Sequence, residues 1–157
     1  ECHGVHYFFM TKEEFEEQIA NGQMLEHAQY CGKYYGTPSS QIMDWIEEGR
    51  DVVLEIEVQG ARQIKEKRPD CVSIFVLPPS IEELEKRLRY RNTEDEETIQ
   101  KRLAVARQEM ETARDYDYVI VNDTIEHTVE QINKIIAAEK LKVSRAKSSI
   151  ERVLNND

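Results

Sequence analysis

Four arginines gather in one short stretch of an acidic chain. The 157 residues carry a formal net charge of −10, yet RLRYRNTEDEETIQKR contains four guanidinium groups. They are Arg87, Arg89, Arg91 and Arg102. Guanidinium forks match phosphate oxygens bidentately, so a convergent set would suit a phosphate site. The same arginines could instead pair with the acidic residues 94–97 in exposed ion pairs of small net worth. The spacing favours neither interpretation, except that Arg89 points away from its neighbours and fits surface pairing.

Two carboxylates interrupt an apolar segment further upstream. Glu55 and Glu57 alternate in VVLEIEVQG, so on a strand over residues 51–58 both would face one side at its carboxyl end. Ligands of open α/β sheets bind at that edge. Structural salt bridges are one explanation for charges on a buried strand, which need partners. We favour a site in which both acids face a cation's water shell or a ligand's N–H groups.

The string YCGKYYGTPSS is a third candidate. Gly36 would allow close approach of a ligand to the backbone, and Thr37 would cap a helix whose first residue is Pro38. Such a helix start suits an anion. A tyrosine-rich β edge followed by an ordinary helix cap is the more common meaning of such a string taken alone.

The elements that must position these residues follow from local patterns. Three capping boxes predict helix starts at Thr11 with Glu14, Ser80 with Glu83, and Thr93 with Glu96. Strands are expected over residues 4–10, 51–58, 71–77 and 117–121, with a hairpin over 24–36 that turns near Gly32. Further helices are expected over 37–49, 60–67 and 124–141. Dense apolar strands that alternate with helices predict an α/β fold, a parallel sheet with helices on both faces.

Composition excludes several classes of protein. No apolar run approaches the ~20 residues of a membrane span, and the first residues do not resemble a signal peptide. The three cysteines and four histidines lack metal-ligand spacing, and the odd cysteine number suits reduced thiols in a cytoplasm. An acidic chain is a poor general binder of nucleic acid. The chain begins with Glu1, and we expect that the start of the natural protein is absent from it.

The ordered strings resemble the guanylate kinase family through most of the chain, to about Lys140. They are GVHYFF, MLEHAQYCGKYYGTP, VVLEIEVQGARQIK, IFVLPPSIEELEKRL, RNTEDEETIQKRL and YDYVIVND. The phosphate loop G-x-x-x-x-G-K-[ST] of that family does not occur in these 157 residues, whose only Gly-Lys pair is Gly32-Lys33.

The resemblance implies a P-loop-kinase-type core sheet with a small mixed β lobe for GMP and a helical lid. By the match, Tyr7 and Tyr35 would bind the GMP phosphate, Glu26 would accept from guanine N1–H and the N2 amine, and Thr37 would touch the base. Gly36, Glu55 and Glu57 would complete the GMP site, although Glu55 and Glu57 stand where many relatives carry aspartate. Arg87, Arg91 and Arg102 would contact ATP phosphates and the transferring phosphoryl group, with Asn122 near the adenine. No residue would bind metal directly; Mg²⁺ would be held through water and nucleotide phosphates.

The implied parts are the GMP lobe (1–37), the core (38–86 and 103–141), the lid region (87–102) and a C-terminal tail (142–157). The implied reaction is ATP + GMP to ADP + GDP in cytoplasmic purine nucleotide metabolism, with no nucleic-acid or membrane partner. These 157 residues alone are expected to be inactive. The alternative is a non-catalytic guanylate-kinase-like domain that binds phosphorylated protein partners, which the retained arginines disfavour. The sequence does not give the oligomeric state.

Overall fold

The computed structural model describes residues 8–30, 32–90 and 95–155. The chain divides into two compact units, Glu1–Cys71 and Val72–Asp157. Each unit has its own two-stranded sheet. The expected division into lobe, core, lid and tail stays a prediction.

A β-hairpin forms the centre of the first unit. Strand β1 (Met24–Tyr30) pairs antiparallel with β2 (Lys33–Pro38), with an irregular register between Met24 and Glu26. Gly32 lies in the connection with φ 78°, a conformation that glycine adopts at little cost. The predicted hairpin and its turn are therefore confirmed.

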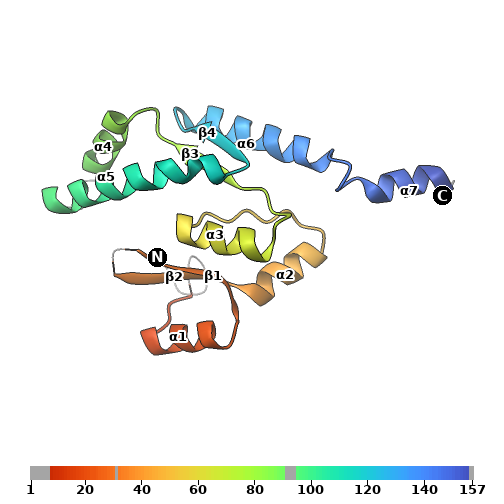
Figure 1. Cartoon of the computed structure of the whole chain (residues 1–157), viewed down its shortest axis with the longest axis horizontal. Coiled ribbons are helices and arrows are strands. Elements are labelled where there is room, and N and C mark those ends of the chain that lie inside the picture. Colours follow the sequence, from red (N-terminus) through yellow and green to blue (C-terminus); the bar gives the residue numbers. More distant parts are fainter. Residues whose placement is uncertain (1–7, 31, 91–94, 156–157) are drawn as a thin grey trace. The chain divides into compact units, whose positions relative to one another are not determined.

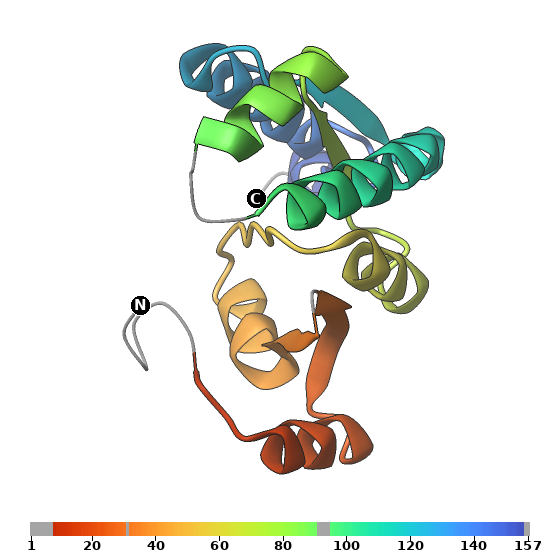
Figure 2. The same cartoon turned by 90° about the vertical axis from the view of Figure 1, so that its left-hand side faces the viewer.

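Three helices pack on this hairpin. They are α1 (Lys12–Ala20), α2 (Ser39–Glu47) and α3 (Val58–Lys67), and Figures 1 and 2 show α1 and α3 on different sides of the strands. Phe15 of α1 is buried and its ring stacks on Tyr34 of β2, with centroids 5.4 Å apart. The capping box of Thr11 and Glu14 is present, since each side chain bonds the other's backbone N–H.

Three local predictions in this unit are wrong. Residues 51–57 form no strand. The apolar pattern of this segment predicts burial, but a strand also requires a hydrogen-bonded neighbouring strand, which the pattern does not specify. The cap of α2 is Pro38, not Thr37, whose hydroxyl bonds another side chain instead. Residues 8–10 also form no strand, and the rest of the expected strand over 4–10 lies outside the described residues.

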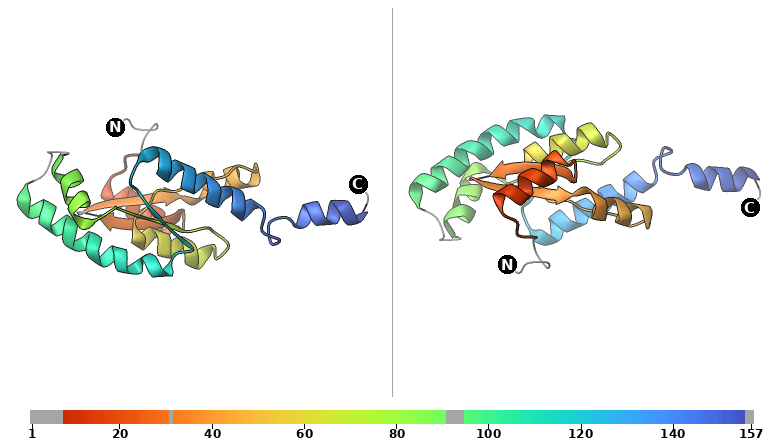
Figure 3. Two further views of the ribbon diagram at one scale, coloured as in Figure 1. Left: turned by 90° about the horizontal axis from the view of Figure 1, so that it is seen from above. Right: turned by 90° about the horizontal axis from the view of Figure 1, so that it is seen from below.

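A parallel strand pair forms the centre of the second unit. Strand β3 (Ile74–Leu77) pairs with β4 (Tyr118–Val121) in parallel, and Ile120 is buried. Both strands lie inside the predicted runs and are shorter than those runs. Helices α5 (Glu96–Glu111) and α6 (Ile125–Lys140) lie on opposite sides of this pair (Figures 1 and 3), which confirms the α/β prediction.

Side-chain caps start the helices of this unit. Ser80 Oγ accepts from the backbone N–H of Glu83 at the start of α4 (Ile81–Tyr90), and Thr124 caps α6. Asp95 caps α5 by accepting from the Thr98 N–H, whereas the predicted cap, Thr93, lies outside the described residues. A 3₁₀ turn, η1 (Thr112–Asp115), follows α5.

Glu139 joins the end of α6 to the turn that follows it. Its carboxylate is buried, accepts from the Tyr118 hydroxyl at 2.6 Å and pairs with Lys142 at 2.5 Å. The lysine and the tyrosine hydroxyl lower the pKa of Glu139. Helix α7 (Lys147–Asn155) then projects beyond α6 (Figure 1). None of the described helices is long and apolar enough to cross a membrane.

Candidate functional site

In the first unit, the carboxylate of Glu26 is enclosed by the hairpin and α3. Glu26 is only 3% exposed, and its Oε1 accepts a hydrogen bond of 2.6 Å from the Thr37 hydroxyl. These two residues are cross-strand partners, so their side chains share one face of the hairpin. A buried carboxylate is costly without such a partner. The structure therefore brings together two of the residues that the sequence assigned to one ligand.

The two faces of the hairpin differ in what they contact. Side chains alternate along β2, so Tyr35 lies on the same face as Thr37, and Tyr34 lies on the opposite face. The side chain of Tyr35 is 41% exposed. On the other face a Cβ on Gly36 would lie 2.9 Å from Phe15 Cζ. Gly36 is thus explained by packing against α1. Tyr7, the expected partner of Tyr35, lies outside the described residues.

Sequence reasoning missed three residues of α3 that fix this face. Gln63 donates to the His27 carbonyl at 2.6 Å and accepts from the His27 N–H, so its amide continues the ladder of β1. Lys67 donates to the Leu25 carbonyl at 2.6 Å. Gly60, on the same side of the helix, lies against the Glu26 carboxylate. The successive spacings of three and four residues between Gly60, Gln63 and Lys67 indicate that they share one side of a helix. The sequence does not indicate which strand that side packs on, because β1 is over thirty residues away.

Glu55 and Glu57 lie in the segment that forms no strand. Glu55 is exposed, and Glu57 is partly buried as the residue that precedes α3, its carbonyl accepting from the Ala61 N–H. The expected alternation along a strand does not apply to them. Their assignment to a ligand or to a cation's water shell stays a prediction.

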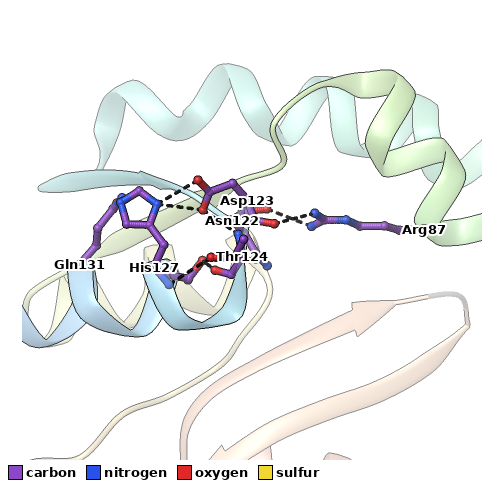
Figure 4. Close-up of polar contacts among 7 residues, drawn as sticks. Arg87, Asn122, Asp123, Thr124, His127 and Gln131 are labelled. Carbon is purple, nitrogen blue, oxygen red and sulfur yellow. Dashed lines mark hydrogen bonds and ion pairs between the residues drawn. The ribbon is translucent and has the colours of Figure 1, made fainter.

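In the second unit, Arg87 of α4 reaches the loop after β4. Its Nε donates to Glu83 at 3.0 Å, and its Nη1 donates to the Asn122 carbonyl at 3.0 Å. Its Nη2 donates to the Asp123 carbonyl at 3.4 Å, and Figure 4 shows the guanidinium facing this main chain. Arg87 and Asn122, predicted to serve one nucleotide, therefore lie side by side.

The loop after β4 is itself fixed by hydrogen bonds. The Asn122 N–H bonds the Leu77 carbonyl at 2.8 Å, and its Oδ1 accepts from Thr128 at 3.3 Å. The Asp123 carboxylate accepts from the Thr124 N–H and faces Nδ1 of His127 at 2.9 Å (Figure 4). These contacts, that of the Thr124 N–H foremost, lower the pKa of Asp123. These bonds hold the loop at Asn122 and Asp123 in place.

The remaining arginines separate into different roles. Arg89 pairs with Glu85 and with Glu96, which confirms the expected surface pairing for this residue. The bonds of Arg89 lower the pKa of Glu96 to about 2. Arg102 lies partly buried on α5, and Arg91 lies outside the described residues. The placement of Arg102 and Arg91 toward a phosphate stays a prediction.

Comparison with known proteins identifies the family. The family model described as Guanylate kinase matches residues 1–139. The chain belongs to the guanylate kinase family. A guanylate kinase of Oceanobacillus iheyensis is 48% identical over 156 residues, covering 99% of this chain and 76% of that protein. One of Clostridioides difficile is 51% identical over 150 residues, covering 96% and 73%.

A solved structure agrees with this assignment. The crystal structure of guanylate kinase from Anaplasma phagocytophilum aligns with a TM-score of 0.78 at 38% identity. It covers 92% of this chain and 71% of that one. The resemblance inferred from the sequence is confirmed, together with the guanylate kinase fold.

Proposed function

We propose that the natural protein carrying this chain transfers the γ-phosphoryl group of ATP to GMP, giving ADP and GDP with Mg²⁺. The observation that supports this most is the enclosed Glu26 carboxylate, held by Thr37 in a chain of this family. A carboxylate accepts from two donors, and the guanine edge offers N1–H and the N2 amine together. Adenine offers no such pair, so the site favours GMP over AMP.

Binding requires a change around Glu26. Since the residue is 3% exposed, a base reaches its carboxylate only when a covering group moves aside. Enclosure then strengthens each hydrogen bond to the base, because water is excluded. In this proposal Thr37 orients the carboxylate, Tyr35 and Tyr7 bind the GMP phosphate, and the backbone at Gly36 contributes to the GMP site.

The ATP side of the proposal rests on Arg87 and the loop at Asn122. Three of the five guanidinium N–H groups of Arg87 serve Glu83 and the two carbonyls. The other two are assigned to ATP phosphate, with Asn122 near the adenine. Arg91 and Arg102 are assigned to the transferring phosphoryl group. Residues 87–102 act as the lid, 1–37 as the GMP lobe, and 38–86 with 103–141 as the core.

Catalysis in this proposal is positioning and charge stabilisation. Phosphoryl transfer asks little covalent chemistry of side chains; arginines neutralise the charge on the phosphoryl oxygens. Mg²⁺, when bound, would add positive charge to that neutralisation. Carboxylates bind the water molecules around Mg²⁺ well. We assign this role to Glu55, which is exposed, and to Glu57, which is partly buried. The proposed location is the cytoplasm, with GMP and ATP as partners and no nucleic acid or membrane.

Steady-state assay of the full-length natural protein with ATP, Mg²⁺ and either GMP or AMP tests the proposal. GDP formation should exceed ADP formation from AMP by at least ~10³-fold in kcat/KM, because a hydrogen-bonding site rejects analogues that leave it unpaired. Comparable rates would overturn the specificity. No transfer to either, with binding of a phosphorylated peptide, would favour the non-catalytic alternative.

The inactivity of these 157 residues alone stays a prediction. It is checked by measuring GDP formation with the chain as given, beside the full-length protein at equal concentration. Sustained formation of GDP by the shorter chain would contradict it.

A further inference from the structure

Gly60 lies where any side chain would meet the Glu26 carboxylate. A Cβ built on Gly60 would be 2.9 Å from Cδ of Glu26, 3.3 Å from Cγ and closer still to Oε2. Real Cβ atoms essentially never approach other heavy atoms below 3.0 Å. Gly22, Gly32 and Gly49 differ, because each has a positive φ and open space around it.

Backbone conformation does not account for this glycine. Gly60 is buried in the first turn of α3 and has ordinary helical geometry, where alanine is the more favourable residue. Glycine is therefore suited to position 60 because it lacks a Cβ. The carboxylate also lies beside the start of a helix, where the helix dipole favours negative charge.

The contacts of α3 with β1 prevent an easy escape from a clash at Gly60. Gln63 bonds both backbone groups of His27, and Lys67 bonds the Leu25 carbonyl. Gln63 and Lys67 follow Gly60 by three and seven residues, so the same side of the helix is held on the strand. A Cβ at position 60 would therefore displace the Glu26 side chain rather than the helix.

We propose that Gly60 is a specificity-determining positioning residue for the base. By lacking a Cβ it lets the Glu26 carboxylate lie between α3 and the Thr37 hydroxyl, in one orientation. This inference rests on the proposed function, in which that carboxylate accepts from guanine N1–H and the N2 amine. A tilted carboxylate would keep one of these bonds and lose the other, so the N2 amine would no longer be distinguished.

The test compares GMP with IMP, which keeps N1–H but lacks the N2 amine. In the full-length protein, Gly60→Ala should raise the KM for GMP at least ~10-fold and reduce the GMP/IMP ratio of kcat/KM by a similar factor. The KM for ATP should stay within about 2-fold, since the proposed function assigns ATP to residues other than Glu26 and Gly60. Gly49→Ala is the matched control, which strains an open, positive-φ position and should leave the GMP/IMP ratio unchanged.

A stability cycle tests the contact without any activity. Gly60→Ala should lower the melting temperature when Glu26 is present and raise it when Glu26→Ala has removed the carboxylate, since alanine is then the better helix residue. Equal shifts in both backgrounds would disprove the contact. This measurement stays valid even if the wild-type protein fails to phosphorylate GMP, which would refute the proposed function instead.

An unchanged GMP/IMP ratio in folded Gly60→Ala protein would overturn the positioning role. If that variant does not fold, Gln63→Met replaces it, because loss of the His27 bonds frees α3 to move off Glu26. The GMP/IMP ratio should then fall in the same direction with kcat retained, and an unchanged ratio would again overturn the proposal.

Discussion

The hydroxyl of Thr37 donates to Oε1 of Glu26 across the hairpin, at 2.6 Å. The bond occupies one lone pair of a carboxylate that is otherwise enclosed, and it fixes how that carboxylate is turned. In the proposed function, Thr37 would therefore act on GMP through Glu26 as well as through its own contact with the base.

Thr37→Val should weaken GMP binding while ATP binding is kept. Valine has the shape of threonine without the hydroxyl, so the carboxylate loses its donor. A hydrogen bond to a charged group contributes about 1.5–3 kcal/mol, which corresponds to a rise in the KM for GMP of about 10- to 100-fold. Steady-state kinetics measure this, with Thr37→Ser as the control that keeps the hydroxyl. An equal KM for GMP in both variants would show that the bond is irrelevant to the base.

Arg87→Ala should reduce kcat/KM for ATP by at least about 100-fold, because a phosphate-facing guanidinium stabilises charge in the transition state. The matched control is Arg89→Ala on the same helix, whose side chain makes exposed ion pairs with Glu85 and Glu96. Exposed pairs of this kind contribute little, so its effect on kcat/KM should stay within about 2-fold. The result that contradicts the ATP role of Arg87 is an equal effect of the two substitutions.

Glu139 should make stability depend on pH in the acidic range. Its pKa in the folded protein lies below the ordinary value of 4.5, chiefly because of the Lys142 ammonium and then the Tyr118 hydroxyl. A depressed pKa means that the stabilisation is complete above about 4.5 and disappears as the pH falls through the folded-state pKa. The melting temperature of Glu139→Gln should thus lie below that of wild type at pH 7 and approach it at low pH.

The control for this pH profile is Glu130→Gln, which removes an exposed pair with Lys134 on the same helix. Its melting temperature should follow that of wild type closely at pH 7. A constant gap between Glu139→Gln and wild type across the acidic range would mean that packing, not the ionised carboxylate, stabilises the end of α6.

Local patterns in the sequence predicted the hairpin around Gly32 and the caps at Thr11 and Ser80, because each depends on neighbours within a few residues. The segment 51–57 was predicted as a strand and is not one, since a ladder depends on a partner that an apolar run does not specify. The spacing of the arginines alone did not indicate whether they bind a phosphate or pair with acidic side chains. The resemblance to the family made that choice, and the structure adds the Asn122 frame for Arg87.

The contacts of Glu26 could not be predicted from local patterns. Thr37 is eleven residues away and was expected to cap a helix, a competing use of the same hydroxyl. Gly60 is helical, so the sequence marks it only as an unfavourable helix residue. The need for glycine at position 60 comes from the Glu26 carboxylate, which lies on a strand far upstream in the sequence. The packing of α3 on β1 brings the two residues together.

The kcat/KM for GMP and for AMP, measured in full-length wild-type protein and in Glu26→Gln, tests most directly whether Glu26 recognises guanine. Glutamine keeps the size of the side chain but presents an amide donor where guanine also donates. The GMP/AMP ratio should fall by about 10- to 100-fold, since at least one charged hydrogen bond is lost. A wild-type GMP/AMP ratio in the Glu26→Gln variant would contradict that role for Glu26.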